Sequence, residues 1–164
     1  MGGDMLNAMK YISTVPFSGL FNWSVQYLND SKIAFSKAYP MMRIGDFLKR
    51  NKTAVAIQDG VKYKRVTIKV RNGGVVLRDE VMGENIGTKK QFLVSEGQFI
   101  LSKIDARNGA MGIIPAELDG AVVTQDFLPY DIDTTKVNPQ YFVLVCTTKQ
   151  FVAFCQSCSS GTTN

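Results

Sequence analysis

The sequence contains no histidine, only three cysteines and no long uninterrupted hydrophobic run. Histidine is the usual general acid or base at neutral pH and the commonest metal ligand, so its absence excludes many hydrolase and metalloenzyme sites. No apolar segment reaches the ~20 residues that a membrane-spanning helix needs. The N-terminus also lacks the basic and then apolar order of a signal peptide. We therefore expect a soluble, cytoplasmic protein with no membrane partner.

The cysteines, Cys146, Cys155 and Cys158, lie close together near the C-terminus. An odd number without a secretory signal argues against a disulfide framework, so we expect reduced thiols. Cys155 and Cys158 have the spacing of half a zinc site or a redox pair, but only one other cysteine is available to complete four ligands. Their helical spacing from Phe151 and Phe154 predicts a buried helix face instead. We expect neither a metal nor a cofactor.

Basic residues are concentrated in the middle of the chain. Residues 43–107 contain 14 Lys and Arg against 7 Asp and Glu, whereas residues 108–164 contain 2 against 5. The net charge of the 164 residues is +5. A polyanionic partner would therefore contact the middle of the chain, although an ordinary solvated surface would give the same balance.

The length fits one domain with an N-terminal extension. Residues 1–40 contain short, weakly helical pieces without a sustained period, which predicts an arm or helical layer beside the domain. Residues 41–158 form the expected domain. Residues 159–164 are expected to be a truncated loop that leads towards a missing helix.

The spacing of apolar residues changes along the domain, from a helical spacing to strict alternation. Residues 44–50 have apolar residues at i, i+3 and i+4, which predicts a helix. From residue 61 the period is two, and in residues 65–71 it puts Val66, Ile68 and Val70 on a core face and Arg65, Lys69 and Arg71 on a basic face. Asn72-Gly-Gly74 predicts a tight turn, with a returning strand at residues 75–78.

Later segments complete the expected architecture. Short apolar runs predict strands at residues 92–94, 99–104, 111–114 and 121–123, and residues 128–137 are expected to be irregular. Asn138-Pro139 is typical of a helix start, and residues 149–157 predict a second helix. We therefore predict a single α+β domain with a small mixed, mainly antiparallel β-sheet flanked by helices.

Catalytic motifs are scarce. Asn138-Pro-Gln-Tyr141 resembles the Asn-Pro-Pro-Tyr/Phe motif of amino methyltransferases, but the second proline and a glycine-rich cofactor turn are missing. Helix capping explains the same residues. We find no P-loop, no Gly-x-Ser-x-Gly and no cluster of carboxylates with a lysine. We predict a non-catalytic protein, and a DNA adenine methyltransferase-like enzyme stays as the alternative.

The remaining polar residues favour binding to double-stranded DNA. Cations contact phosphates, while arginine forks and amides recognise base edges. The candidate DNA-binding residues are Arg65, Lys69 and Arg71 on the strand face, Lys89 and Lys90 for phosphates, and Lys103, Arg107 and Asn108 in a loop. Arg107 and Asn108 are the candidates for base edges. Asp105 lies between Lys103 and Arg107 at alternate positions of the sequence, so these three residues could instead satisfy one another in a purely structural ion pair.

Residues 97–127 are the most distinctive stretch of the chain. The segments from Gly97 to Pro115 and from Leu118 to Phe127 closely resemble the core signature of target-recognition domains in the DNA-specificity subunits of type I restriction-modification systems. Segments 63–68, 75–79, 138–142 and 159–163 resemble the family in the same order. The resemblance covers roughly residues 41–164.

This resemblance implies an α+β recognition module, similar to DNA methylase specificity domains, that reads one half of a bipartite target. Its partners would be the DNA methyltransferase (modification) subunits and the restriction subunit, which perform methyl transfer and ATP-driven cleavage. Family members normally have two such domains and two conserved helices, so the chain resembles a fragment or half-subunit. A protein-interaction domain whose basic face meets an acidic subunit is a further alternative.

Overall fold

The computed structural model describes residues 38–159. The arm expected over residues 1–40 therefore lies almost entirely outside the described residues, as does most of the expected loop at 159–164. Within residues 38–159, no helix is long and apolar enough to cross a lipid bilayer.

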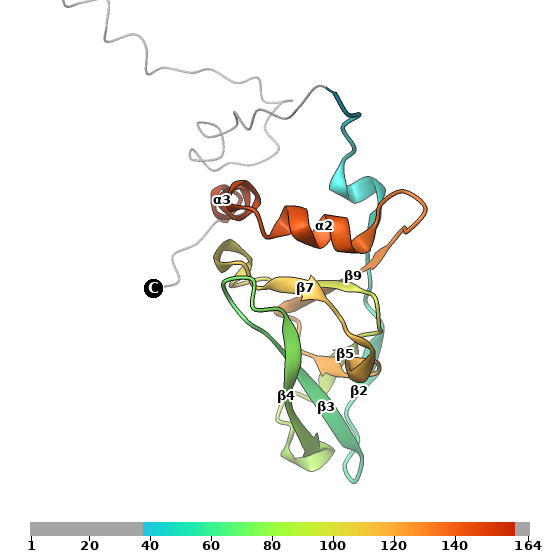
Figure 1. The fold of residues 1–164 in the computed structure, drawn as a ribbon. Coiled ribbons are helices and arrows are strands. Elements are labelled where there is room, and N and C mark those ends of the chain that lie inside the picture. Colours follow the sequence, from blue (N-terminus) through green and yellow to red (C-terminus); the bar gives the residue numbers. More distant parts are fainter. Residues whose placement is uncertain (1–37, 160–164) are drawn as a thin grey trace, which may run out of the picture.

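The strands form two sheets, which Figure 1 shows one above the other. The four-stranded sheet is antiparallel throughout and has the order β1-β9-β6-β7. The five-stranded sheet has the order β2-β5-β8-β3-β4 and contains one parallel pair, β3 with β8. The strands are β1 (Leu48–Arg50), β2 (Ala54–Ala56), β3 (Lys62–Ile68), β4 (Val75–Met82), β5 (Lys90–Leu93), β6 (Phe99–Ser102), β7 (Met111–Ile113), β8 (Val122–Val123) and β9 (Phe127–Ile132).

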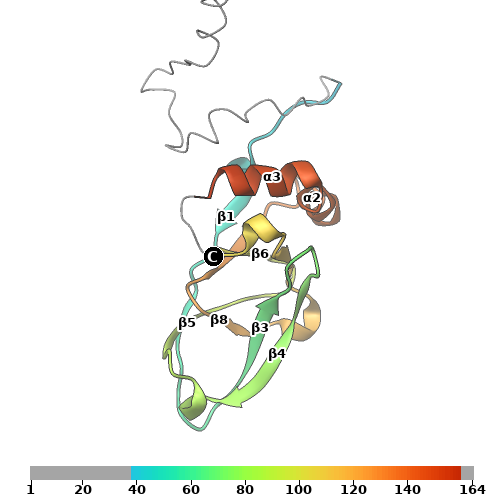
Figure 2. The ribbon, with the colours of Figure 1, turned by 90° about the vertical axis from the view of Figure 1, so that its left-hand side faces the viewer.

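Helices α2 (Pro139–Cys146) and α3 (Lys149–Ser157) form a layer on the side of the four-stranded sheet that faces away from the five-stranded sheet (Figure 1). Within residues 38–159, short 3-10 helices occupy four loops: η3 (Ile44–Asp46), η4 (Gly83–Asn85), η5 (Ala106–Asn108) and η6 (Ala116–Leu118). Figure 2 shows the β3–β4 hairpin running from η4 at one end of the molecule to the helices at the other.

Two apolar clusters hold these layers together. One joins the sheets through buried residues such as Val66, Ile100 and Leu118. The other joins the helices to the four-stranded sheet, and its centre is Phe142, whose ring meets Phe47 at 5.1 Å and Phe99 at 4.9 Å in edge-to-face geometry. Such aromatic contacts add roughly 0.5–1.5 kcal/mol each to the burial of apolar area. The second cluster therefore fixes the helical layer against the four-stranded sheet.

The predicted α+β class and the mainly antiparallel pairing are confirmed, as are both C-terminal helices and the β3–β4 hairpin. The single predicted sheet is wrong, because the strands divide into two sheets. The predicted helix at residues 44–50 is also wrong: only one 3-10 turn forms, and β1 then pairs with β9. Residues 128–132 belong to β9 and are not irregular.

Candidate nucleic-acid interface

The tip of the β3–β4 hairpin is a two-residue turn built on Arg71 and Asn72. Both have φ of 57°, and the N–H of Gly73 donates to the carbonyl of Val70 at 3.2 Å. A turn with two positive φ values matches the right-handed twist of the flanking strands, and asparagine tolerates this conformation better than arginine does. Because β3 ends at Ile68, Arg71 does not lie on the strand face predicted for it. It stands at the tip of the hairpin.

Hydrogen bonds attach this tip to two other parts of the molecule. The N–H of Arg71 donates to the carbonyl of Asn108 at 2.7 Å, and the N–H of Asn72 donates to the carbonyl of Gly109 at 3.1 Å. The side-chain Nδ2 of Asn72 donates to the carbonyl of Thr147, between α2 and α3, at 3.2 Å. The strained turn is therefore held by its surroundings, which fixes the backbone from which the Arg71 side chain extends.

Helix α3 lies beside the hairpin tip and the η5 loop and forms the third side of this region. The Nε2 of Gln156 donates to the carbonyl of Arg107 at 3.3 Å, which joins α3 to η5. Lys149, Val152, Ala153 and Gln156 have the spacing i, i+3, i+4 and i+7, so they form one face of the helix. The hairpin tip, the η5 loop and α3 thus enclose one open groove of about 670 Å³. Its lining residues are Val70, Arg71, Asn72, Arg107, Asn108, Gly109, Thr147, Lys149, Val152, Ala153 and Gln156.

The charge of this groove is entirely positive. Arg71, Arg107 and Lys149 come from three different elements, and no Asp or Glu is among the described residues that line it. Three residues with amide side chains, Asn72, Asn108 and Gln156, also line the groove. Guanidinium and ammonium groups donate to phosphate oxygens, and amides can both donate to and accept from base edges. The groove therefore has the chemistry of a surface that binds a polyanion carrying hydrogen-bonding groups.

Three of the eight predicted DNA-binding residues meet in this groove: Arg71, Arg107 and Asn108. One N–H of the Asn108 amide donates to Oδ1 of Asp105 at 3.0 Å, so part of its hydrogen-bonding capacity is used inside the loop. Lys69 and Lys103 are exposed next to the hairpin tip and the η5 loop, respectively, but neither lines the groove.

Arg65 is placed differently. Its Nε and Nη2 donate to the two carboxylate oxygens of Asp79, each at 2.7 Å, in a bidentate pair across β3 and β4. The hydrogen bonds from Arg65 lower the pKa of Asp79, and the same hydrogen bonds raise the pKa of Arg65. A β-bulge at this point leaves Arg78 without a cross-strand partner, and its Nε lies 3.8 Å from Asp79. Arg65 therefore stabilises the hairpin.

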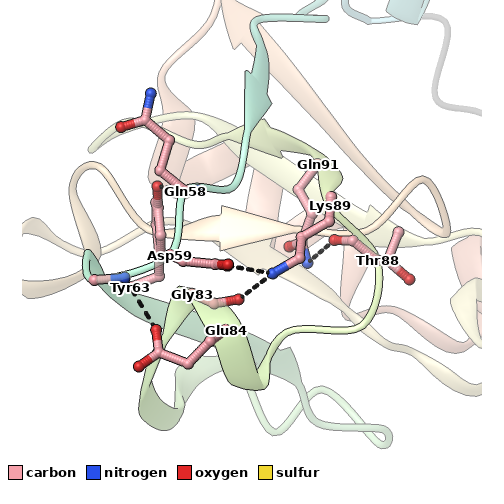
Figure 3. A network of polar contacts seen from close by, with 9 residues as sticks. Gln58, Asp59, Tyr63, Gly83, Glu84, Thr88, Lys89 and Gln91 are labelled. Carbon is pink, nitrogen blue, oxygen red and sulfur yellow. Dashed lines mark hydrogen bonds and ion pairs between the residues drawn. The ribbon is translucent and has the colours of Figure 1, made fainter.

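Lys89 lies near the end of the hairpin that is remote from the groove, because its side chain contacts Gly83 of η4 (Figure 3). Figure 3 shows the Nζ of Lys89 between the carboxylate of Asp59 and the carbonyl of Gly83, at 2.7 Å from each. The N–H of Gly60 donates to Glu84 at 3.0 Å, which lowers the pKa of that carboxyl. Lys89 thus joins two loops, and Lys90 is exposed at the start of β5. The eight predicted residues do not form one surface.

Among the lining residues with charged or amide side chains, sequence reasoning missed three: Asn72, Lys149 and Gln156. Lys149 and Gln156 were visible as polar residues seven positions apart on a predicted helix, which puts them on one face. Nothing in the sequence showed that this face meets the tip of a distant hairpin. Asn72 was assigned to the turn, but not to the groove wall.

The other motifs have structural roles. The Oδ1 of Asn138 accepts from the N–H of Tyr141 at 3.0 Å, which confirms it as the N-cap of α2. Cys146 is fully buried in the apolar cluster around Phe142, and the partly buried Cys155 packs against this cluster. Burial raises the pKa of Cys146 to about 12 and of Cys155 to about 11, so both thiols stay protonated at neutral pH. Phe154, predicted on the buried face, is 38% exposed.

A scan against protein-family models finds no match to the chain, and no curated protein is similar to it at the level searched.

Proposed function

We propose that this domain recognises double-stranded DNA as a specificity subunit, or part of one, in a type I restriction-modification complex. The resemblance of residues 97–127 to target-recognition domains supports this function, and the α+β architecture of two small sheets is compatible with a DNA methylase specificity-like fold. In this proposal the domain reads one half of a bipartite target and directs partner methyltransferase and restriction subunits. The domain itself makes and breaks no bonds.

One observation carries the proposal: Arg71, Arg107 and Lys149 line one groove together with three amide side chains and without a carboxylate among the described residues. A single cluster of this kind supplies both sequence-independent attraction to phosphates and directional donors for bases. The hydrogen bonds that fix the hairpin tip reduce the ordering that binding would require. Arg107, the central residue of η5, is our candidate for contact with a guanine edge.

Helix capping by Asn138 disfavours the methyltransferase alternative. Its side-chain oxygen accepts from the backbone of Tyr141, and Tyr141 is 64% exposed on the surface of α2. Neither residue lines the cationic groove. We therefore propose recognition, and no methyl transfer, for this chain.

Selection from a library of random DNA duplexes tests sequence recognition directly. We expect the full chain to enrich one short contiguous motif, because a single domain reads one half-site. Arg107→Ala should lose discrimination at one position of that motif, equivalent to about 1–3 kcal/mol. Equal retention of all duplexes, at a salt concentration where the chain still binds, would contradict the proposal.

A further inference from the structure

A second, smaller pocket lies in the five-stranded sheet, at the point where β8 ends. Strand β8 has only two residues, Val122 and Val123, and it lies between β3 and β5. The chain leaves this sheet after Val123, and residues of β3, β5 and β8 line the pocket that remains there. Its volume is about 190 Å³, and it shares no lining residue with the cationic groove.

The inner end of this pocket carries an amide with an unused acceptor. Gln91 is 2% exposed, and its Nε2 donates to the carbonyl of Thr88 at 3.1 Å (Figure 3). No donor within residues 38–159 bonds to its Oε1, yet no fully buried side-chain oxygen of these residues lacks a partner. Oε1 therefore keeps a small accessible area, which faces the pocket that Gln91 lines. Because an acceptor in a buried place is stable only with a donor, this end favours a ligand that donates a hydrogen bond.

The outer end carries two guanidinium groups. Arg65 uses Nε and Nη2 to bind Asp79, whereas its Nη1 makes no hydrogen bond within the described part of the chain. The side chain of Arg78 is 61% exposed, and its terminal nitrogens also have no hydrogen-bond partner among residues 38–159. Two guanidinium groups beside one carboxylate leave an excess of positive charge. Guanidinium groups match the geometry of phosphate oxygens, so this end favours a phosphate group.

The walls between these two ends are largely apolar. Ile86 and Val122 are each 1% exposed, and the partly buried Phe127 also lines the pocket. An apolar cavity of about 150 Å³ is large enough to hold benzene. The pocket of about 190 Å³ therefore has room for one six-membered ring.

We propose that this pocket binds a pyrimidine mononucleotide. The ring occupies the apolar part and donates its N3–H to Oε1 of Gln91, while the phosphate accepts hydrogen bonds from Arg78 and from Nη1 of Arg65. The two ends of the pocket thus recognise the two ends of one ligand. The site does not depend on DNA recognition, since the cationic groove is lined by other residues.

Calorimetric titration of the full chain with uridine 5′-monophosphate tests this proposal. Uridine and inorganic phosphate serve as partial ligands, because each can satisfy only one end of the pocket. We expect saturable one-to-one binding of the mononucleotide, at least about tenfold tighter than that of either partial ligand. A mononucleotide methylated at N3 lacks the donor for Gln91 and should bind about tenfold more weakly, with no change in the protein.

Arg78→Ala provides the complementary test on the protein side. It removes charge-assisted hydrogen bonds to the phosphate, so it should weaken mononucleotide binding by about tenfold or more. Arg43→Ala is the matched control, because Arg43 is exposed and lines neither the pocket nor the groove. This control should leave the affinity unchanged.

Four results would overturn the proposal. The first is the absence of saturable binding of uridine 5′-monophosphate, and the second is equally tight binding of inorganic phosphate or of the methylated probe. The third is an equal effect of Arg78→Ala and Arg43→Ala. The fourth is loss of binding in the variant Arg71→Ala, Arg107→Ala and Lys149→Ala, which would assign the mononucleotide to the cationic groove.

Discussion

Gly109 is the residue on which the shape of the groove depends most directly. Its φ is +76°, and a β-carbon added there would lie 2.6 Å from Oδ1 and 3.1 Å from N of Asn72. The second distance involves a backbone nitrogen that cannot move without breaking its hydrogen bond to Gly109. A side chain at this position would therefore push the hairpin tip away from the η5 loop.

Gly109→Ala should destabilise the protein more than Gly120→Ala does. Gly120 has a similar φ of +72°, and a β-carbon added there would have no atom beyond its chain neighbours within 4 Å. The Gly120→Ala variant therefore measures the backbone strain alone, which is about 1–2 kcal/mol. The additional loss in Gly109→Ala measures the contact with Asn72. Urea unfolding of both variants checks this expectation, and equal losses would show that the tip adjusts without cost.

Asp79 contributes stability through its charged form. Because hydrogen bonds from Arg65 lower its pKa in the folded state, this contribution is present above the unfolded pKa near 3.8 and is lost as pH falls through the lower folded value. Asp79→Asn should therefore be less stable than the wild type at neutral pH, and the difference should shrink below about pH 4. Glu117→Gln, at an exposed carboxylate, serves as the control in denaturant titrations at each pH. A pH-independent difference would contradict this assignment.

Helix α2 depends on its first turn. The side chain of Asn138 satisfies one of the N–H groups that have no partner within the helix, and Pro139 follows at a position where proline is favourable. Asn138→Ala should reduce the free energy of unfolding by about 1 kcal/mol, while Asn138→Ser should retain most of it. Chemical denaturation distinguishes the two. If serine were as damaging as alanine, Asn138 would have a role beyond capping.

Elements with strong local signals were predictable from the sequence. Residues 149–157 have helical spacing, and the structure places α3 over the same residues, with Thr148 as its N-cap. The β3–β4 hairpin followed from its alternating residues and turn signal, although the turn moved from residues 72–74 to Arg71 and Asn72. In both cases residues that are close together in the sequence determine the local structure, so a local sequence pattern is enough to predict it.

Elements that depend on distant partners were not predictable. Residues 44–50 have only three apolar positions, which suit a helix or a short strand equally, and pairing of β1 with β9 decided between them. Pro129 lies within β9, although proline cannot donate to a ladder. Its position causes little loss here, because the pairing of β1 with β9 ends at Tyr130.

At the scale of the whole molecule, the distribution of charge was only partly predictable. Residues 43–107 contain an excess of cations, but the fold does not bring them together: Lys89 contacts Gly83 near one end of the hairpin, whereas Arg71 stands at the other end. Asp79 and Asp59 pair with Arg65 and Lys89, whereas Arg71 and Arg107 join Lys149 from the less basic final third of the chain. Only tertiary packing brings the three cations of the groove together, so no local pattern reveals them.

The salt dependence of duplex binding tests the groove most directly. The comparison uses the full chain, the triple variant Arg71→Ala, Arg107→Ala and Lys149→Ala, and a control with the same change of charge, Lys49→Ala, Lys52→Ala and Lys90→Ala. The three control lysines are exposed and do not line the groove. Each lost phosphate contact should reduce the slope of log affinity against log salt by about 0.9. We predict that the groove variant loses most of the slope and affinity while the control keeps both; equal losses in the two variants would contradict the account.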